Sequence, residues 1–440
     1  MIAPLLALAL SLSDLRADLA RGVGAVQLPA GETHLDRPLE VPPHAKNVTL
    51  RGHPTGSTLV LDAGFKGSAA IVVNGAYNVT LSGFTIRGNR TELNSDWYLP
   101  EHSEPFADYY SGNGILVRKT ERLIVRGVQF RSIRAFPLLI NASSHVLVES
   151  VDIQDCGTLD RAGRNNPTGG ILLEEGVSAF QIRHANVARV TGNAIWTHSY
   201  NDSPRSSDGL IMGSTISTVG RDAIQIGHAT KIRVENNNGS EIGFPAEYAD
   251  LEHHGTPVAL DTAGNVDYSF YTDNRFTGIN GECINLDGFH DGQVTGNSCQ
   301  NLKPIETYPA LHYGIVFGNN NPAANPNNNV VSGNTMRGFA YGGAFVIGQN
   351  NRIENNRFED LNLAHCGTSP VPARCAYALD QPDLLRSGIY LGSNGGRPAT
   401  TVNNIIRNNT SSGFGIKEHC ITAAPGVSLK KNTLANNTCN

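Results

Sequence analysis

Charged side chains are scarce in this sequence: Lys, Arg, Asp and Glu make up 17% of the 440 residues, against about 25% in an average soluble domain. Helical bundles and coiled coils are therefore unexpected, because both need Ala, Glu, Lys and Leu at high density. The 34 basic residues form no cluster and are outnumbered by 39 acidic ones, which argues against a nucleic-acid surface. No apolar run of about 18 residues occurs, so we expect no membrane span.

Several signature motifs are absent as well. The spacings C-x-x-C, C-x-x-C-H and H-E-x-x-H do not occur, so we predict no zinc site and no other resident metal. A G-x-S-x-G segment is missing too, which disfavours a serine hydrolase. We expect no cofactor unless the protein is a Ca²⁺-dependent lyase.

The seven cysteines favour an exported protein. Cys366 and Cys375 bracket a short loop, and Cys420 and Cys439 bracket the last hairpin-like segment. Both pairs are candidates for disulfides in an oxidising compartment. Together with the apolar residues 2–12, which have the length of a signal-peptide core, they predict a secreted or periplasmic location.

The first residues are open to two interpretations. Residues 1–13 are either a signal peptide or the beginning of a cap, and residues 14–440 form the main domain. A helix is expected over about 14–22, starting near Ser13, with Leu15, Leu19 and Ala20 on one face. Such a helix would cover the open first coil of a repeat structure and remove an exposed sheet edge.

One short pattern repeats along the chain: alternating apolar residues, a turn, and a second short strand that ends in Asn or Gly. Equivalent residues recur at 23 to 26 positions, as from Ile115 to Leu138 and from Val258 to Ile284. Period-2 alternation with glycine-rich corners predicts β-strands, and this spacing predicts one solenoid coil per repeat. We expect the recurrent Asn residues to form a ladder at one corner. Its expected members are Asn236, Asn237, Asn297, Asn334, Asn356 and Asn409. Copies of the first strand include GILVRK (114–119), GILLEE (170–175), AIQIGH (223–228) and CINLDG (283–288).

These copies, the Asn turns and the N-terminal helix resemble a right-handed parallel β-helix of the pectate-lyase-like superfamily. The resemblance covers essentially the whole chain and implies an all-β, single-domain solenoid with a short N-terminal capping helix. It also implies carbohydrate-active chemistry, although the same fold hosts lyases, hydrolases, epimerases, esterases and non-catalytic adhesins.

Polar side chains gather on one face of the middle coils. If the first and third apolar residues of each copy point inward, the second and fourth face outward. A second column, two residues before the first apolar strand position of each copy, holds Gly169, Asn193, Asp222, Thr256, Glu282 and Tyr313 and so adds two carboxylates. The outward positions of the middle coils are Leu172, Glu174, Trp196, His198, Gln225, Gly227, Ala259, Asp261, Asn285 and Asp287.

Two carboxylate pairs follow from this alignment. Asp261 and Asp287 are predicted in one column on adjacent coils, about 5 Å apart, which suits a retaining pair or one shared proton. Asp222 and Glu282 are predicted two coils apart, about 9.6 Å, near the upper limit for an inverting pair. We take these four as the catalytic candidates.

A local segment adds a partial resemblance. GRDAIQIGH (220–228) is similar to the G-D-D-C-x-x-I segment of polygalacturonase-type hydrolases, which places Asp222 on the second Asp of that motif. Arg221 stands where the first Asp would be, and Asn193 lies where an N-T-D segment would precede it. The resemblance implies glycoside hydrolysis, and these departures weigh against pectin as the substrate.

Our leading hypothesis is a glycoside hydrolase that acts on a polysaccharide or oligosaccharide in a groove walled by long insertions. Trp and Tyr stack on sugar faces, while His, Gln, Asn and acidic side chains bind hydroxyls. The substrate-binding candidates are Glu174, Trp196, His198, Gln225, His228, His254, Asn285 and His290.

Other interpretations remain open at this stage. Asp222 is also suited to cap a turn, Asp261 and Asp287 to bind Ca²⁺, and the histidines to form ordinary polar surface. The alternative functions are a polysaccharide lyase or uronate epimerase, which needs Ca²⁺ or Arg and a proton-abstracting base, and a non-catalytic glycan-binding or adhesion solenoid.

Overall fold

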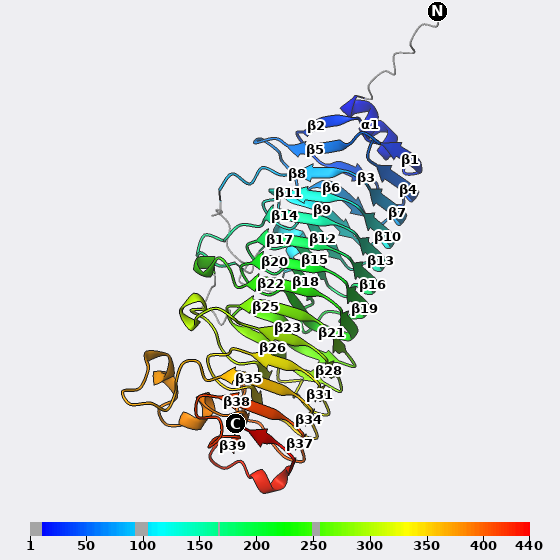
Figure 1. The fold of residues 1–440 in the computed structure, drawn as a ribbon. Helices are drawn as coiled ribbons and strands as arrows, with labels where there is room; N and C mark the ends of the chain where they lie inside the picture. The colour runs from blue at the N-terminus through cyan, green and yellow to red at the C-terminus, as the bar shows by residue number, and fades with distance from the viewer. Residues whose placement is uncertain (1–10, 93–103, 166–167, 249–255) are drawn as a thin grey trace, which may run out of the picture.

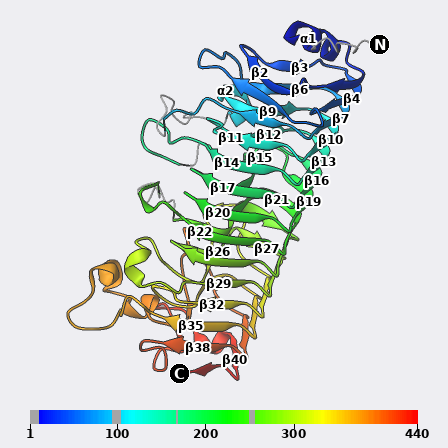
Figure 2. The ribbon, with the colours of Figure 1, turned by 45° about the horizontal axis from the view of Figure 1, so that its top comes forward.

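The chain winds into a parallel β-helix, whose coils stack from the N-terminal to the C-terminal end in Figures 1 and 2. This is a computed structural model that describes residues 11–92, 104–165, 168–248 and 256–440. Each complete coil contributes strands to three parallel ladders, where the sequence pattern predicted two strands per repeat. The apparent second strand is in fact two strands, because a tight turn such as the one at Gly83 (φ 69°) separates β7 (Tyr77–Ser82) from β8 (Thr85–Arg87).

The first ladder carries the outward-facing polar residues. Its strands are β3 (Leu39–Val41), β6 (Ala69–Asn74), β9 (Asn113–Arg118), β12 (Leu138–Asn141), β15 (Ile171–Glu174), β18 (Ile195–His198), the first part of β21 (Ile224–Glu235), the first part of β23 (Val258–Asp267), β26 (Glu282–Asp287), β30 (Ile315–Gly318), β33 (Ala344–Val346), β36 (Ile389–Leu391) and β39 (Ile421–Ala423).

The second ladder joins the first through the long strands β21 and β23. It contains β1 (Gly24–Gln27), β4 (Lys46–Arg51), β7 (Tyr77–Ser82), β10 (Glu121–Arg126), β13 (Ser144–Glu149), β16 (Ser178–Arg183), β19 (Ser206–Met212), the second part of β21, β24 (Phe270–Thr272), β27 (Phe289–His290), β28 (Gln293–Thr295), β31 (Val330–Ser332), β34 (Arg352–Glu354), β37 (Ile405–Arg407) and β40 (Thr433–Ala435).

The third ladder is a separate sheet. It contains β2 (Gly31–Leu35), β5 (Ser57–Leu61), β8 (Thr85–Arg87), β11 (Gln129–Arg131), β14 (Asp152–Cys156), β17 (Asn186–Val190), β20 (Thr215–Val219), β22 (Asn238–Ile242), β25 (Arg275–Ile279), β29 (Ser298–Gln300), β32 (Thr335–Arg337), β35 (Arg357–Leu361), β38 (Thr410–Gly413) and β41 (Thr438–Cys439).

Helices are few and short in the described residues, and they lie at the first coil or in the connections. They are α1 (Leu12–Ala20), α2 (Phe106–Tyr109) and the 3-10 turns η1 (Ala246–Tyr248), η3 (Ile305–Thr307), η4 (Ala373–Ala378), η5 (Pro382–Leu385) and η6 (Leu429–Lys431). None of the helices in the described residues has the length and apolarity that a membrane span requires.

The predicted capping helix is present and begins slightly earlier than expected. Ser11, not Ser13, caps α1, and its hydroxyl accepts the Asp14 amide while the Asp14 carboxylate accepts the Ser11 amide. Leu15 and Leu19 are buried against the first coil, as predicted. Ala20 is exposed, contrary to expectation, because the helix ends there. The signal-peptide interpretation of residues 1–13 falls mostly outside the described residues.

The interior is one continuous apolar core of inward Ile, Val, Leu and Phe side chains. An Asn ladder runs along one corner, as predicted, and each Nδ2 amide donates to the Oδ1 of the next Asn at 2.9 to 3.0 Å. Asn236 was expected in this ladder but adopts a positive φ beside it. The members are Asn237, Asn274, Asn297, Asn334, Asn356, Asn409 and Asn437.

Three disulfides fasten the solenoid. The two predicted pairs, Cys366–Cys375 and Cys420–Cys439, are present. Sequence reasoning missed the third, Cys283–Cys299, which joins β26 to β29 across the core. Cys156 is buried and unpaired.

Candidate functional site

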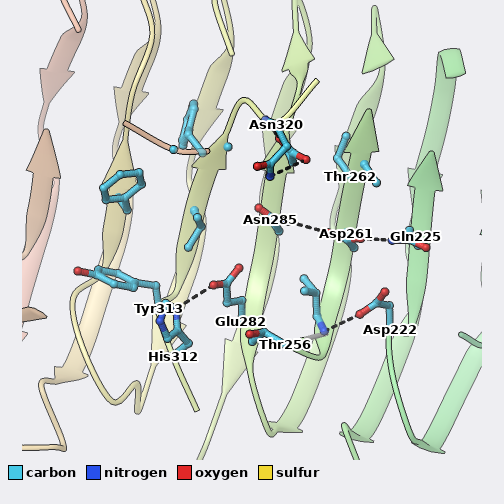
Figure 3. A pocket seen from close by; sticks show the side chains of 18 of the residues that line it. Asp222, Gln225, Thr256, Asp261, Thr262, Glu282, Asn285, His312, Tyr313 and Asn320 are labelled. Atoms are coloured by element: carbon cyan, nitrogen blue, oxygen red, sulfur yellow. Dashed lines mark hydrogen bonds and ion pairs between the residues drawn. The ribbon is translucent and has the colours of Figure 1, made fainter. Parts of the chain in front are cut away.

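A cavity of about 470 Å³ lies on the outward face of the first ladder over β21, β23, β26 and β30. All four catalytic candidates, Asp222, Asp261, Glu282 and Asp287, line it. In Figure 3, Asp222, Glu282 and Tyr313 lie in one row across the strands, and Gln225, Asp261 and Asn285 form a parallel row. The cavity therefore brings together carboxylates that are up to 65 positions apart in the sequence.

Asp222 stands directly before β21 and is almost fully buried. Its Oδ1 accepts the Val258 amide at 2.9 Å, and its Oδ2 lies 3.5 Å from Nε of Arg221. The turn-capping interpretation is thus partly right, although the bond goes to the neighbouring coil. Burial raises the pKa of Asp222, and the Asp261 charge raises it further, against the opposing effect of Arg221.

Asp261 is held by amides on both sides. The Nδ2 of Asn285 donates to its Oδ1 at 2.9 Å, and the Nε2 of Gln225 donates to its Oδ2. Gln225 in turn accepts from Nδ2 of Asn193 at 2.8 Å. Burial raises the pKa of Asp261, and the two amide bonds oppose that rise. Both carboxylate oxygens are therefore engaged, and the row fixes its amide groups over the cavity floor.

The predicted column of Asp261 and Asp287 is wrong. In the register of the structure, Leu260 pairs with Ile284 and Asp261 with Asn285, while Asp287 pairs with Gly318 on the next coil. The sequence alignment slipped by two residues, which a period of two cannot detect. Both Asp287 oxygens contact Asn320, at 2.7 Å from its backbone amide and 3.2 Å from Nδ2. The register thus separates the two carboxylates that were expected to form a retaining pair or hold Ca²⁺.

Asp222 and Glu282 do lie two coils apart, as predicted, because Asn193, Asp222, Val258 and Glu282 occupy equivalent positions. Two steps of about 4.8 Å separate their backbones by about 9.6 Å. Val258, not Thr256, fills the position between them. The carboxylate Oε1 of Glu282 lies 2.8 Å from Nδ1 of His312 (Figure 3), and Nε2 of that ring lies 3.4 Å from the Tyr377 hydroxyl.

A smaller cavity of about 230 Å³ adjoins the first one and shares Gln225 and Ala263 with it. Trp196, His198 and His228 line this smaller cavity. Burial lowers the pKa of His198 to about 4 and also lowers that of His228. Both rings are therefore neutral at pH 7, and each can donate a hydrogen bond from one ring nitrogen and accept one at the other.

Two substrate-binding candidates are not on an open face. Trp196 points outward, as predicted, but is only 7% exposed, because the Phe106 ring covers it with centroids 5.2 Å apart. Glu174 is fully buried, since its carboxylate accepts the amides of Phe106 and Ala107 at 2.8 and 2.7 Å. Glu174 anchors the α2 segment and lines neither cavity.

The remaining candidates differ in their positions. Gln225 and Asn285 line the large cavity. His290 is on β27, where its ring contacts Asp291 and Asn265, and it lines neither cavity. His254 lies outside the described residues.

Sequence reasoning missed several residues of the large cavity. Tyr313 occupied the same column as Asp222 and Glu282, so a signal for it and its neighbour His312 was present. Arg221 was noted only as a departure from a motif. Phe345, on β33, was not singled out. Tyr377 and Leu384 carried no periodic signal, because they lie in an irregular insertion between β35 and β36.

Comparison with solved structures shows the same architecture at low identity. PfbA, a surface adhesin of Streptococcus pneumoniae, matches with a TM-score of 0.58 and 15% identity, over 80% of this chain and 87% of its own. The PL6 family alginate lyase AlyGC matches with a TM-score of 0.56 and 14% identity, over 98% of this chain and 50% of its own. DFA-IIIase from Arthrobacter chlorophenolicus A6, in complex with GF2, matches with a TM-score of 0.52 and 14% identity, over 96% of this chain and 91% of its own.

No curated protein matches the chain. The family model described as a right handed beta helix region matches residues 69–251 and 258–440, which is far more than half of the sequence. The three parallel ladders and the continuous core agree with that match, and the chain belongs to the right-handed β-helix family.

Proposed function

We propose that the protein is an exported glycoside hydrolase that cleaves an oligosaccharide or polysaccharide with Asp222 as general acid and Glu282 as general base. The observation that carries this proposal is the pair itself: Asp222, a buried carboxyl whose pKa burial raises, stands two coils from the Glu282 carboxylate on the same cavity floor. Inverting hydrolases separate their two carboxyl groups by about 6.5–9.5 Å to hold a water between them. The disulfides support export, since they persist in oxidising compartments.

In this mechanism Asp222 donates its proton to the glycosidic oxygen as the bond from that oxygen to the anomeric carbon breaks. Glu282 takes a proton from a water whose oxygen forms the new bond to the same carbon from the opposite face. The Nδ1 of His312 faces the Glu282 carboxylate and orients it. The products are two sugars, and each carboxyl group ends in the opposite protonation state.

The other two carboxylates have supporting roles in this proposal. Asp261 repels charge on Asp222 and so helps to keep that carboxyl protonated. The two Asp287 oxygens accept hydrogen bonds from the backbone amide and Nδ2 of Asn320, so Asp287 holds the loop after β30 against the cavity.

The charge of the lining favours an uncharged sugar. Four carboxylates face the cavity with Arg221, and no lysine is among the described lining residues. A uronate carboxylate would meet like charges at short range, which costs free energy in a partly buried site.

A uronate lyase is the second candidate. Arg221 lines the cavity, and its guanidinium, whose Nε lies 3.5 Å from Oδ2 of Asp222, places a positive charge there. That group is suited to a substrate carboxylate, and His312 or Tyr313 would then serve as the base that removes a carbon-bound proton. This chemistry yields an unsaturated sugar and consumes no water.

The test is an incubation of the purified protein with neutral polymers (inulin, arabinan, xylan) and acidic ones (polygalacturonate, alginate), with and without a chelator. Reducing ends without ultraviolet absorbance of an unsaturated product are expected. Absorbance would establish the lyase instead. If both signals are absent and binding to the polymers is retained, the protein is a glycan-binding solenoid.

Variants assign the roles. Asp222→Asn and Glu282→Gln should each lower kcat by about 10²–10⁴, and Asp291→Asn, outside both cavities, is the matched control. Activity that survives both cavity substitutions would contradict the assignment.

A further inference from the structure

The large cavity is closed at the end nearer the C-terminal coils. The insertion between β35 and β36 folds over the first ladder and places Tyr377 and Leu384 in the lining. Beneath it, the Phe345 ring stacks on Tyr390 with centroids 6.0 Å apart, and Tyr390 is only 2% exposed. The open floor therefore ends at Phe345.

This end wall is firmly attached. The guanidinium of Arg374 donates to the Tyr308 carbonyl at 3.1 and 3.2 Å, and the Tyr341 hydroxyl donates to the Arg374 carbonyl at 2.8 Å. The Cys366–Cys375 disulfide closes the insertion on itself, and Leu385 is buried in the main core. Several independent contacts thus hold the wall in place, so it acts as a fixed boundary.

The opposite end is closed as well. The smaller cavity continues the larger one past Gln225 and stops at Trp196, where Phe106 covers the sheet. The Tyr200 hydroxyl donates to the Glu104 carbonyl at 2.9 Å and ties the two covering segments together. Beyond this point the outward residues of the first ladder form a second buried apolar cluster under α2.

One side of the floor is also bridged. The Nδ2 of Asn321 donates to Oδ1 of Asn201 at 2.9 Å, which joins two loops 120 residues apart. Arg397 adds a third loop, because its guanidinium donates to the carbonyls of Asn319 and Asn321 at 2.7 and 2.5 Å. These loops follow the carboxyl ends of β18, β30 and β36 and form a continuous rim.

We propose that the site takes saccharide ends: the enzyme cleaves short oligosaccharides or terminal units and does not cut within a polymer. This inference rests on the proposed hydrolase function. The terminal sugar lies against Tyr313, Phe345 and Tyr377, and the chain extends over Asp261 toward Gln225 and the smaller cavity. A polymer that continued in both directions along the coils would run into both end walls.

The closed end is chemically suited to a single sugar ring. Phe345 and Tyr377 offer aromatic surface on which a ring face can stack. The Tyr313 hydroxyl lines the same end and has no hydrogen-bond partner among the described residues. A buried hydroxyl without a partner costs free energy, which a sugar hydroxyl at that position would recover.

The experiment compares reducing ends, viscosity and product length on inulin, arabinan and xylan and on their di- to hexasaccharides. We expect one short product from the first time point, nearly constant viscosity, and hydrolysis of the short oligosaccharides at least as fast per chain end as that of the polymer. A rapid fall in viscosity with products of mixed length would overturn the inference and leave the hydrolase function intact. Failure to release reducing ends from any of these substrates would overturn both.

Substitutions in the end wall give a second test. Leu384→Ala and Tyr377→Ala should each lower kcat/KM on the shortest substrate by about tenfold and lengthen the products. Tyr268→Ala is the control, because that ring is 55% exposed and lines neither cavity. If folded wall variants, as judged by thermal unfolding, keep the parent's product lengths and rates, the wall does not bound the substrate and the inference is wrong.

Discussion

At the scale of single residues, Asp222 combines a structural bond with a perturbed acidity. Its Oδ1 accepts the Val258 amide, and burial raises its pKa. In the unfolded chain the carboxyl titrates near its ordinary value of about 3.9. A group with a raised folded pKa stabilises the fold fully below its unfolded pKa, and that contribution is lost as the pH rises through the folded pKa.

Asp222→Asn should therefore remove activity and, at the same time, raise the free energy of unfolding at pH 8 relative to the parent protein. Asparagine has an oxygen for the Val258 amide and carries no charge to bury. Chemical denaturation at pH 4 and pH 8 measures both proteins, and the difference between them should grow with pH. If the variant is less stable than the parent at pH 8, the folded protein stabilises the charged form of Asp222, and the prediction is wrong.

If Asp222 is the proposed general acid, the activity of the parent protein should fall on the alkaline side, because a general acid must be protonated to donate. The loss of kcat should follow the raised folded pKa of Asp222 and not the ordinary value of a carboxyl. A pH profile of kcat on the best substrate of the panel checks this. An alkaline limb that is unchanged in Arg221→Met, which lacks the opposing charge, would contradict the assignment.

At the scale of elements, the α2 segment depends on Glu174. Its carboxylate accepts two backbone amides of that segment and the Nδ2 of Asn141, and burial raises its pKa to about 7. Glu174→Ala should release the segment, and hydrogen exchange at Phe106 and Ala107 should quicken by at least about tenfold, since two hydrogen bonds of about 1 kcal/mol each are lost. Glu174→Gln keeps an acceptor and should show a smaller effect.

The Asn ladder gives a second prediction at this scale. Asn297 is buried, and its side chain bonds to Asn274, Asn334 and the Tyr271 carbonyl. Asn297→Ala leaves buried polar groups unpaired at about 1–3 kcal/mol each, and the midpoint of thermal unfolding should fall clearly. Asn437→Ala, at the more accessible end of the ladder, should cost much less because water can replace the lost bond.

The element scale also shows how far sequence reasoning can reach. Repeat length, alternation and Asn turns predicted the fold, the cap, the corner ladder and the coils that hold the site. Alternation could not place Asp261 against Asn285, because a two-residue slip keeps every side chain on its face. Irregular insertions gave no periodic signal, so neither the cover over Trp196 nor the wall at Tyr377 was predictable.

At the scale of the whole molecule, the Cys283–Cys299 disulfide joins the strand that carries Glu282 to the opposite sheet. Its 16-residue separation corresponds to about 3 kcal/mol of loop-closure entropy. The double variant Cys283→Ala/Cys299→Ala should unfold at a lower temperature, with kcat affected more than in the Cys366→Ala/Cys375→Ala variant. Equal losses of kcat in both would show that the first disulfide has no special link to the site.

The rim and the end walls consist of loops between strands, whereas the floor belongs to the ladders. Mutations therefore meet two different selective constraints. A change of length in a loop remodels the wall and leaves the hydrogen-bond register of Asp222, Asp261 and Glu282 unchanged, while a one-residue change inside β23 would exchange core and floor. If the proposed hydrolase function holds, descendants of this chain can thus diverge in the saccharide they accept through their insertions, with the same carboxylates beneath.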